Sequence, residues 1–109
     1  MQRRASLRSQ ADVPVTVMAD GRPFDCRAID LSPDGARVVR SKGLLAHEGR
    51  PLYWLHFLLG ATGVRALARP TRTDGHEQSY RFVLISDTDR LTLAEHMDVA
   101  HRVFGAALF

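Results

Sequence analysis

The chain is poor in cysteine, lysine and aromatic residues, and the shortages of cysteine and of aromatic residues limit the kinds of site it can form. Cys26 is the only cysteine, so no disulfide can form within the chain, which fits a reducing compartment such as the cytoplasm. A zinc site that needs two or more thiolates is excluded for the same reason. Aromatic residues make up only 7% of the chain. Tyr53, Trp54 and Phe57 share one apolar segment, so we interpret them as core residues rather than as a platform for stacking bases.

Long hydrophobic runs and a secretory signal are also missing. The longest dense apolar run covers residues 52–59 with His56 inside it, and it is far too short to span a bilayer. The first eight residues are basic and lack the apolar stretch of a signal peptide. We therefore expect a cytoplasmic protein without membrane insertion.

What the chain does have is arginine. Its 109 residues are 45% apolar, which suits one domain with a single core, and its formal net charge is +3. The basic residues are 14 arginines and one lysine, Lys42. Codon usage alone explains such a bias, but arginine also brings a planar five-donor fork suited to phosphates and stacked bases. The net charge by itself is weak support for a nucleic-acid polymer as partner.

Alternation of apolar and polar residues predicts a mainly β fold. Asp20-Gly21 and Asp74-Gly75 are strong hairpin-turn signals. The segment 52–59 is apolar at nearly every position, so we expect both of its faces to be covered. The predicted strands span residues 13–17, 22–29, 36–40, 52–59, 64–73 and 79–85.

The period changes after residue 86 from two to that of a helix, predicted over about 87–104. Ser86 or Asp87 is the expected N-terminal cap, and Gly105 ends or weakens the helix. One helical face carries apolar residues at spacings of three and four, namely Leu93, Met97, Ala100, Phe104 and Leu108. We therefore predict a six-stranded antiparallel β-barrel plugged or covered by one C-terminal helix. Residues 1–12 are expected to form a flexible leader and residues 13–109 a single domain.

Two clusters of residues are candidates for chemistry. The first is Arg3, Arg4 and Arg8 in the leader, and the second is Asp30, Ser32 and Gly35 between the second and third predicted strands. Each has a structural explanation when it is taken alone. Basic leaders are commonly just solvated, and Ser32-Pro33-Asp34-Gly35 fits a type I turn with proline at its second position.

Taken together, the two clusters describe an anionic ligand that carries guanine. Arginines clamp phosphates with paired hydrogen bonds, and they also contact the O6/N7 edge of guanine. A carboxylate such as that of Asp30 accepts hydrogen bonds from the N1–H and N2–H₂ groups of guanine, and the Ser32 hydroxyl donates or accepts. Gly35 allows close approach of the backbone or a positive φ.

These residues resemble the signature of the PilZ domain family. That signature consists of RxxxR before the first strand, here Arg4 to Arg8 preceded by Arg3, and [D/N]xSxxG after the second, here Asp30 to Gly35. The resemblance covers almost the whole chain, because six strands followed by a helix also match. It implies a non-catalytic receptor for the bacterial second messenger cyclic di-GMP, with a downstream protein partner. Arg4 and Arg8 would contact phosphate and guanine, and Asp30 and Ser32 the guanine edge.

The resemblance also assigns roles to the remaining two residues. Gly35 would shape the loop, and Arg3 would influence whether one ligand or a stacked pair binds. Ligand binding would fold the leader over the barrel, and a partner protein would read the new surface.

Two alternatives of other classes stay open. The first is a PilZ-like adaptor domain that acts through protein contacts without nucleotide. The second is a small RNA-binding barrel that uses arginines on exposed strand faces, namely Arg65, Arg69, Arg72 and Arg81.

Catalytic and metal sites are not expected. The chain has no G-x-S-x-G elbow, P-loop or G-x-G-x-x-G motif. Asp87 and Asp89 are better explained as partners of a helix start than as a catalytic pair. The five histidines show no spacing typical of metal ligands.

Overall fold

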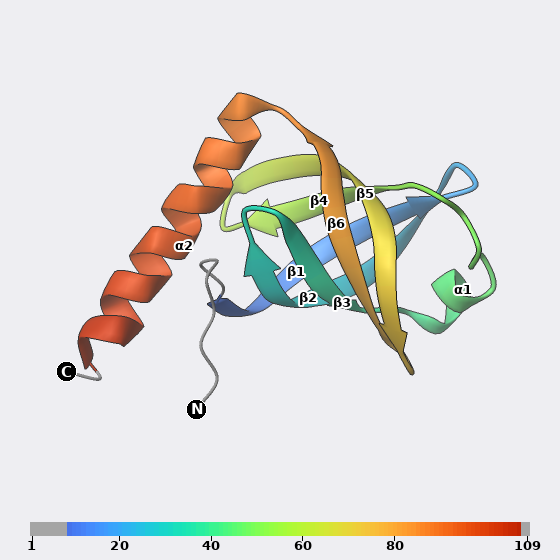
Figure 1. Cartoon of the computed structure of the whole chain (residues 1–109), viewed down its shortest axis with the longest axis horizontal. Coiled ribbons are helices and arrows are strands. Elements are labelled where there is room, and N and C mark those ends of the chain that lie inside the picture. Colours follow the sequence, from blue (N-terminus) through green and yellow to red (C-terminus); the bar gives the residue numbers. More distant parts are fainter. Residues whose placement is uncertain (1–8, 108–109) are drawn as a thin grey trace.

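The computed structural model describes residues 9–107, and the side chains of residues 11–97. It contains six strands, a short helix and a long C-terminal helix (Figure 1). The strands are β1 (Ser9–Ala19), β2 (Arg22–Ser32), β3 (Gly35–Val39), β4 (Tyr53–Leu59), β5 (Thr62–Asp74) and β6 (Glu77–Ile85), and the helices are α1 (Lys42–Leu45) and α2 (Asp87–Ala107).

The six strands form a closed antiparallel barrel in the order β1-β2-β3-β6-β5-β4, with β4 returning to β1. Four of the contacts join strands that follow one another in sequence, and β3–β6 and β1–β4 close the barrel. The predicted six-stranded barrel with a C-terminal helix is therefore confirmed.

The β1–β2 hairpin shows how local sequence fixes the register. Asp20 and Gly21 form its two-residue turn with φ values of 53° and 73°. Positive φ at both positions is the requirement of a type I′ turn, which matches the twist of the flanking strands. The turn pairs Ala19 with Arg22 and sets the alternation that buries Val15 and Val17.

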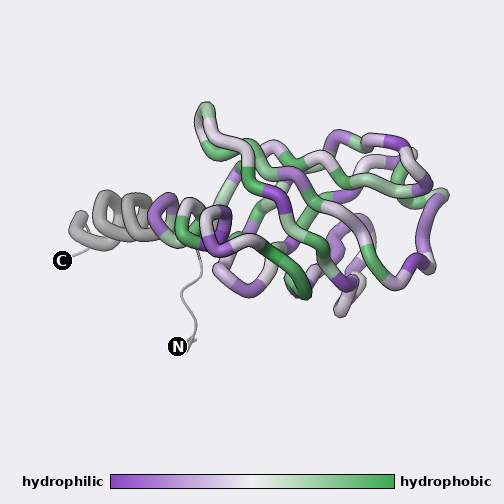
Figure 2. The backbone as a smooth tube through the Cα atoms, turned by 90° about the horizontal axis from the view of Figure 1, so that it is seen from above, coloured by the Kyte–Doolittle hydropathy of each residue, from purple (hydrophilic) through white to green (hydrophobic). Residues whose placement is uncertain are grey.

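Side chains alternate between the barrel core and solvent along most strands. Hydrophobic and hydrophilic residues follow one another along the chain trace in Figure 2. The expectation that both faces of the fourth strand are covered is wrong. Leu55 and Phe57 are buried, whereas His56 is exposed and Leu58 is 50% exposed. The strand lies in a one-layer barrel, and no layer packs over its outer face.

Trp54 was expected in the core with Tyr53 and Phe57, and for Trp54 this is wrong. Tyr53 and Phe57 are buried, but Trp54 has the opposite phase on β4 and lies half-buried on the outer face. There the guanidinium of Arg65 lies 4.9 Å from the centre of its ring. A cation over the face of a tryptophan ring is a favourable contact at such a distance.

The two helices lie at opposite ends of the barrel (Figure 1). Helix α1 lies between β3 and β4, is capped by the Ser41 hydroxyl, and inserts Leu44 into the core. Helix α2 packs against β5, β2 and β1 and contributes Leu93 and Met97 to the core, both 0% exposed.

The start of α2 is as predicted, and its end lies further along. The Ser86 hydroxyl accepts a hydrogen bond from the backbone of Asp89 at 3.0 Å, so Ser86 is the cap. The Asp89 carboxylate instead accepts from the backbone N–H of Arg65 at 3.2 Å, which ties the helix to β5. The helix runs through Gly105 to Ala107, so this glycine does not end it.

Two strand boundaries differ from expectation near the candidate residues. Strand β1 begins at Ser9 rather than Val13, so the last four residues expected in the flexible leader belong to the barrel. Strand β2 continues to Ser32, so Asp30 and Ser32 belong to a strand instead of a loop. The apolar alternation of β1 and β2 ends before the strands do. Backbone pairing between β1 and β2 extends β1, and pairing of β2 with β1 and β3 extends β2.

Candidate ligand-binding site

The Ser32–Gly35 segment forms a tight hairpin turn between β2 and β3. Ser32 pairs with Gly35, so only Pro33 and Asp34 lie between the two strands. Neither residue of this turn has a positive φ. Proline at the second position of the four-residue turn fits a type I geometry, as the sequence predicted.

The Ser32 hydroxyl organises this turn. It accepts hydrogen bonds from the backbone N–H groups of Asp34 at 3.3 Å and Gly35 at 3.1 Å, and it lies 3.2 Å from the Gly35 carbonyl, to which it donates. The residue is 9% exposed. Ser32 therefore shapes the turn that carries it, which supports the structural explanation of this residue.

Gly35 is required because of space. Of the two expected reasons for glycine, a positive φ does not apply here, and close approach of the backbone does. A Cβ on Gly35 would lie 2.2 Å from the backbone oxygen of Tyr80 on β6, a distance that real Cβ atoms essentially never show. The close approach of β3 to β6 is therefore the property for which glycine is needed.

An extra residue in β2 turns Asp30 to the outside of the barrel. The pairing with β3 passes from Ala28–Val38 directly to Asp30–Arg37, so Ile29 forms a β-bulge. In a regular strand Asp30 would share the phase of Ala28, which is 0% exposed and faces the core. The bulge reverses the alternation and avoids the cost of burying a carboxylate among apolar side chains.

Asp30 lies on the outer face opposite Arg37. Its carboxylate is 2.9 Å from Nη2 of Arg37, and its side chain is only 13% exposed. Nε of Arg37 lies 3.6 Å from the Glu77 carboxylate on β6 but has no hydrogen bond with a described residue. A chain of alternating charges, Asp30–Arg37–Glu77, thus crosses three strands next to the turn.

An open groove of about 430 Å³ lies beside the turn. The backbone oxygen of Asp34 accepts a hydrogen bond from the N–H of Phe82 at 2.8 Å, which attaches the turn to β6. The Asp34 carboxylate also lies 3.9 Å from Arg90 of α2. The groove is lined by Ser32, Asp34, Gly35, Ala36, Thr71, Ser79, Tyr80 and Arg81.

The barrel and its β2–β3 hairpin agree with the match of this sequence to a known protein family. The family model of the PilZ domain matches residues 2–98 of the 109. The chain belongs to the PilZ domain family. Domains of this family are generally receptors without catalytic activity.

Solved structures share the fold of this PilZ domain at low sequence identity. The Bacillus subtilis inhibitor of motility MotI/DgrA superposes with a TM-score of 0.74 and 18% identity, over 93% of this chain. The chain spans about half the length of MotI/DgrA, 52%. The PilZ domain of CeSA from a cellulose-synthesizing bacterium gives 0.60 and 19%, covering 92% of this chain and 97% of that one.

An uncharacterized Legionella protein gives a TM-score of 0.57 and 14% identity, over 94% of this chain and 98% of its own. No curated protein matches the chain. At these identities the likeness to solved structures concerns the fold alone.

The structure brings together only part of the predicted site of this PilZ domain. Asp30, Ser32 and Gly35 lie within one hairpin, whereas Arg3, Arg4 and Arg8 lie outside the described residues. The sequence analysis missed Arg37, the ion-pair partner of Asp30. The signal was present, because the alternation of β3 puts Arg37 on the outer face between buried Ala36 and Val38.

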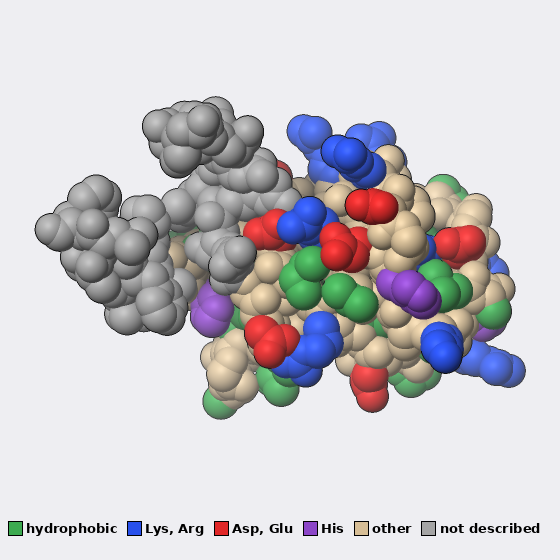
Figure 3. Space-filling model, turned by 90° about the horizontal axis from the view of Figure 1, so that it is seen from below, with side chains coloured by type: hydrophobic (Ala, Val, Ile, Leu, Met, Phe, Trp, Pro, Cys, Tyr) green, Lys and Arg blue, Asp and Glu red, His purple; other side chains and the backbone are tan. Residues whose placement is uncertain are grey.

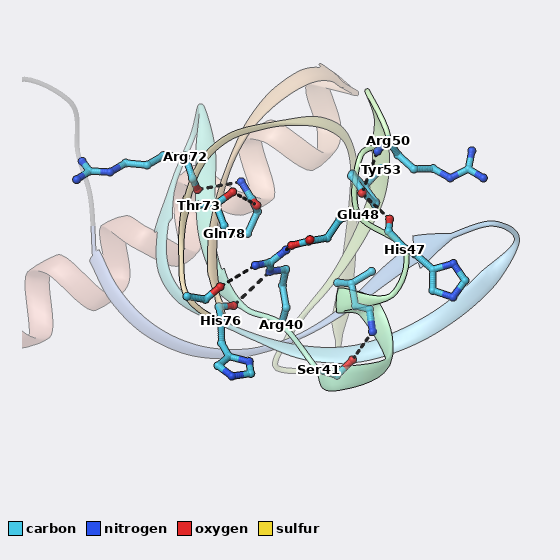
Figure 4. A network of polar contacts seen from close by, with 12 residues as sticks. Arg40, Ser41, His47, Glu48, Arg50, Tyr53, Arg72, Thr73, His76 and Gln78 are labelled. Atoms are coloured by element: carbon cyan, nitrogen blue, oxygen red, sulfur yellow. Dashed lines mark hydrogen bonds and ion pairs between the residues drawn. The ribbon is translucent and has the colours of Figure 1, made fainter.

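A second cavity, of about 420 Å³, lies near α1 and carries a polar network (Figure 4). Arg40, 6% exposed, reaches the Glu48 carboxylate at 2.6 Å and donates to the backbone oxygens of Gly75 at 2.8 Å and His76 at 3.3 Å. These contacts hold the β5–β6 hairpin to the segment after α1. The network is therefore structural.

The part of the chain that the structure describes holds no group of three or more potential metal-ligating side chains. Within the same part, no helix is both long and apolar enough to cross a bilayer.

Proposed function

We propose that this PilZ domain is a non-catalytic receptor for cyclic di-GMP, with the ligand bound at the β2–β3 hairpin. One observation carries the proposal. The bulge at Ile29 puts Asp30 on the same outer face as the Ser32–Gly35 turn, and Ser32 and Gly35 of that turn line an open groove. The Asp30 carboxylate, the Ser32 hydroxyl and the backbone at Gly35 therefore all lie on one outer face of the barrel.

Asp30 is suited to recognise guanine. An ionised carboxylate has about four lone-pair sites, so pairing with Arg37 is compatible with accepting hydrogen bonds from a base. The N1–H and N2–H₂ groups of guanine are two adjacent donors, whereas adenine has a different pattern on that edge. Arg37 holds the carboxylate in place and limits the rotamer entropy lost when the ligand binds.

The phosphates of the ligand would be bound by arginines of the leader. The family resemblance assigns this role to Arg4 and Arg8, and Arg3 precedes them as a further guanidinium. Paired hydrogen bonds between arginine and phosphate are among the stronger polar contacts in proteins. The proposed signal is the closure of this segment over the ligand, which creates a surface for a downstream protein.

Titration calorimetry with cyclic di-GMP tests the proposal. Two compounds serve as controls: GTP carries guanine but is not a cyclic dinucleotide, and cyclic di-AMP is a cyclic dinucleotide without guanine. Micromolar binding needs a net free energy of roughly 8 kcal/mol. Charge-assisted hydrogen bonds at about 1.5–3 kcal/mol each are enough to supply it after the ordering cost. The molar ratio reports whether one or two ligands bind.

Three variants assign the residues. Arg4→Ala, Arg8→Ala and Asp30→Ala should each lower affinity at least about tenfold, equivalent to ~1.4 kcal/mol. Arg22→Ala is the matched control, because Arg22 is an exposed arginine at the far end of β2 from Ser32. If the wild type gives neither heat nor a thermal shift, the receptor proposal fails, and the adaptor alternative takes its place.

A further inference from the structure

The barrel register places arginines of β5 and β6 beside the candidate site. Across the outer face, Ser32 pairs with Gly35, Gly35 with Arg81, and Arg81 with Arg69. The next row runs in parallel from Asp30 through Arg37 and Ser79 to Arg72. Neighbouring strands lie about 4.7–4.9 Å apart, so Arg69 is roughly 10 Å from Gly35.

The β5 and β6 positions of these rows carry three exposed arginines, namely Arg69, Arg72 and Arg81. None of them makes an ion pair with any described residue. Figure 4 shows Arg72 extending away from the internal polar network, and Arg81 lines the groove beside the turn. Figure 3 shows one group of basic side chains at the top of that face and further basic side chains at its lower left and lower right.

Other arginines on the outer face are already engaged. Arg37 is paired with Asp30 and lies near Glu77, and Arg65 lies over the ring of Trp54. Arg65 is also displaced from the other β5 arginines by a half-buried leucine, Leu67. The four arginines considered for RNA binding therefore do not act as one set, because only three of them lie next to the β2–β3 hairpin.

The pairing of Arg69 with Arg81 is unfavourable in the free protein. Like charges directly opposite each other on antiparallel strands destabilise the pair. Neither Arg69 nor Arg81 makes an ion pair with an acidic side chain among the described residues. An anion bound between the two guanidinium groups removes the repulsion and gains paired hydrogen bonds to oxygen.

We infer that Arg69, Arg72 and Arg81 form a second anion-binding strip that holds one phosphate of the bound dinucleotide. The inference rests on the proposed function, because it concerns the same ligand. With the guanine at the β2–β3 hairpin, the strip binds the phosphate that faces β6.

Arg81 is the decisive position for a test, because it is adjacent to both Gly35 and Arg69. Arg81→Ala should weaken cyclic di-GMP binding about tenfold, equivalent to ~1.4 kcal/mol, and Arg69→Ala/Arg81→Ala should weaken it further. Arg81→Lys keeps the charge but loses the fork, so its affinity should fall between those of Arg81→Ala and wild type. Arg22→Ala should bind as wild type does.

Two further measurements separate binding from folding. The double variant should melt at the same temperature as the wild type or slightly above it, because the like-charge pair is gone. Its affinity should also depend less on salt, since fewer charges attract the ligand. A large fall in melting temperature, with affinity unchanged once the protein is folded, would mean that these arginines only support the barrel.

The outcomes also distinguish this inference from the proposed function. If wild type and all strip variants bind cyclic di-GMP equally well, the receptor proposal stands and the strip is wrong. If wild type binds no cyclic di-GMP, both are wrong. If the variants lose affinity for a single-stranded RNA oligonucleotide but keep that for cyclic di-GMP, RNA is the ligand of the strip and the inference is overturned.

Discussion

Gly35 and Tyr80 lie in backbone contact across the β3–β6 pair, with 2.2 Å between an added Cβ on Gly35 and the Tyr80 carbonyl oxygen. The contact is to backbone, so it cannot be relieved by a change of rotamer. It brings the candidate turn against the strand that carries Arg81, and it sets the shape of the groove between them.

Gly35→Ala should therefore destabilise the domain. Overpacking a close-packed site costs about 1–3 kcal/mol, and the required shift of β3 should also weaken ligand binding. Gly63→Ala is the matched control, because no atom lies within 4 Å of an added Cβ there and its φ is not positive. Urea unfolding compares the two, and equal stability of both variants would contradict the close approach.

Ser32→Ala tests whether the Ser32 hydroxyl stabilises the turn or contacts the ligand. Loss of the hydroxyl leaves the backbone N–H groups of Asp34 and Gly35 without their partner. We expect a loss of about 1–2 kcal/mol in the free energy of unfolding. Ser79→Ala is the control for the unfolding measurement alone, because its hydroxyl makes no hydrogen bond with a described residue while Ser79 itself lines the groove. If Ser32→Ala loses affinity for cyclic di-GMP but no stability, the hydroxyl contacts the ligand rather than the turn.

Arg40→Lys should destabilise the domain by roughly 1.5–3 kcal/mol, because an ammonium group cannot reach Glu48 and two backbone oxygens in the directions of the guanidinium fork. Glu48→Gln should cost less than about 1 kcal/mol, since the Glu48 side chain is 56% exposed. Thermal unfolding measures both. Equal losses would mean that the ion pair, and not the bonds to the β5–β6 hairpin, is what matters.

The domain should lose stability in alkaline solution. Burial raises the pKa of the Cys26 thiol above its ordinary value of 9.0, although a hydrogen bond from Ser41 opposes the shift. Burial also raises the pKa of Tyr80 above 10.0, and the neighbouring Tyr53 adds to this. Both groups lose protons more readily when unfolded. Their contribution is therefore complete below about pH 9 and is lost as the pH rises through the raised values.

Urea unfolding between pH 7 and pH 11 measures this decline. Tyr80→Phe removes one of the two titrating groups, so its stability should fall less steeply than that of the wild type above pH 10. A variant with the same slope as the wild type would rule out Tyr80 as a source of the pH dependence.

Local pattern was enough to predict several features that the structure confirms. The Asp20-Gly21 turn and the cap at Ser86 each depend on residues close together in the chain. The pattern failed for the outer face of β4, because an apolar run does not reveal whether another layer covers it.

By itself the sequence determined the strand order along the chain, the terminal helix, the turn residues and the family signature, because these follow from periodicity and from conformational preferences over a few residues. Tertiary structure alone decided that Asp30 faces outward opposite Arg37, that Gly35 meets Tyr80, and that Arg81 stands beside the turn. These relations depend on one extra residue at Ile29 and on the β3–β6 pairing, which joins segments some forty residues apart. A bulge shifts a register by one residue at little local cost, and closure of the barrel selects that register because it buries Leu31 and keeps the Asp30 carboxylate out of the core.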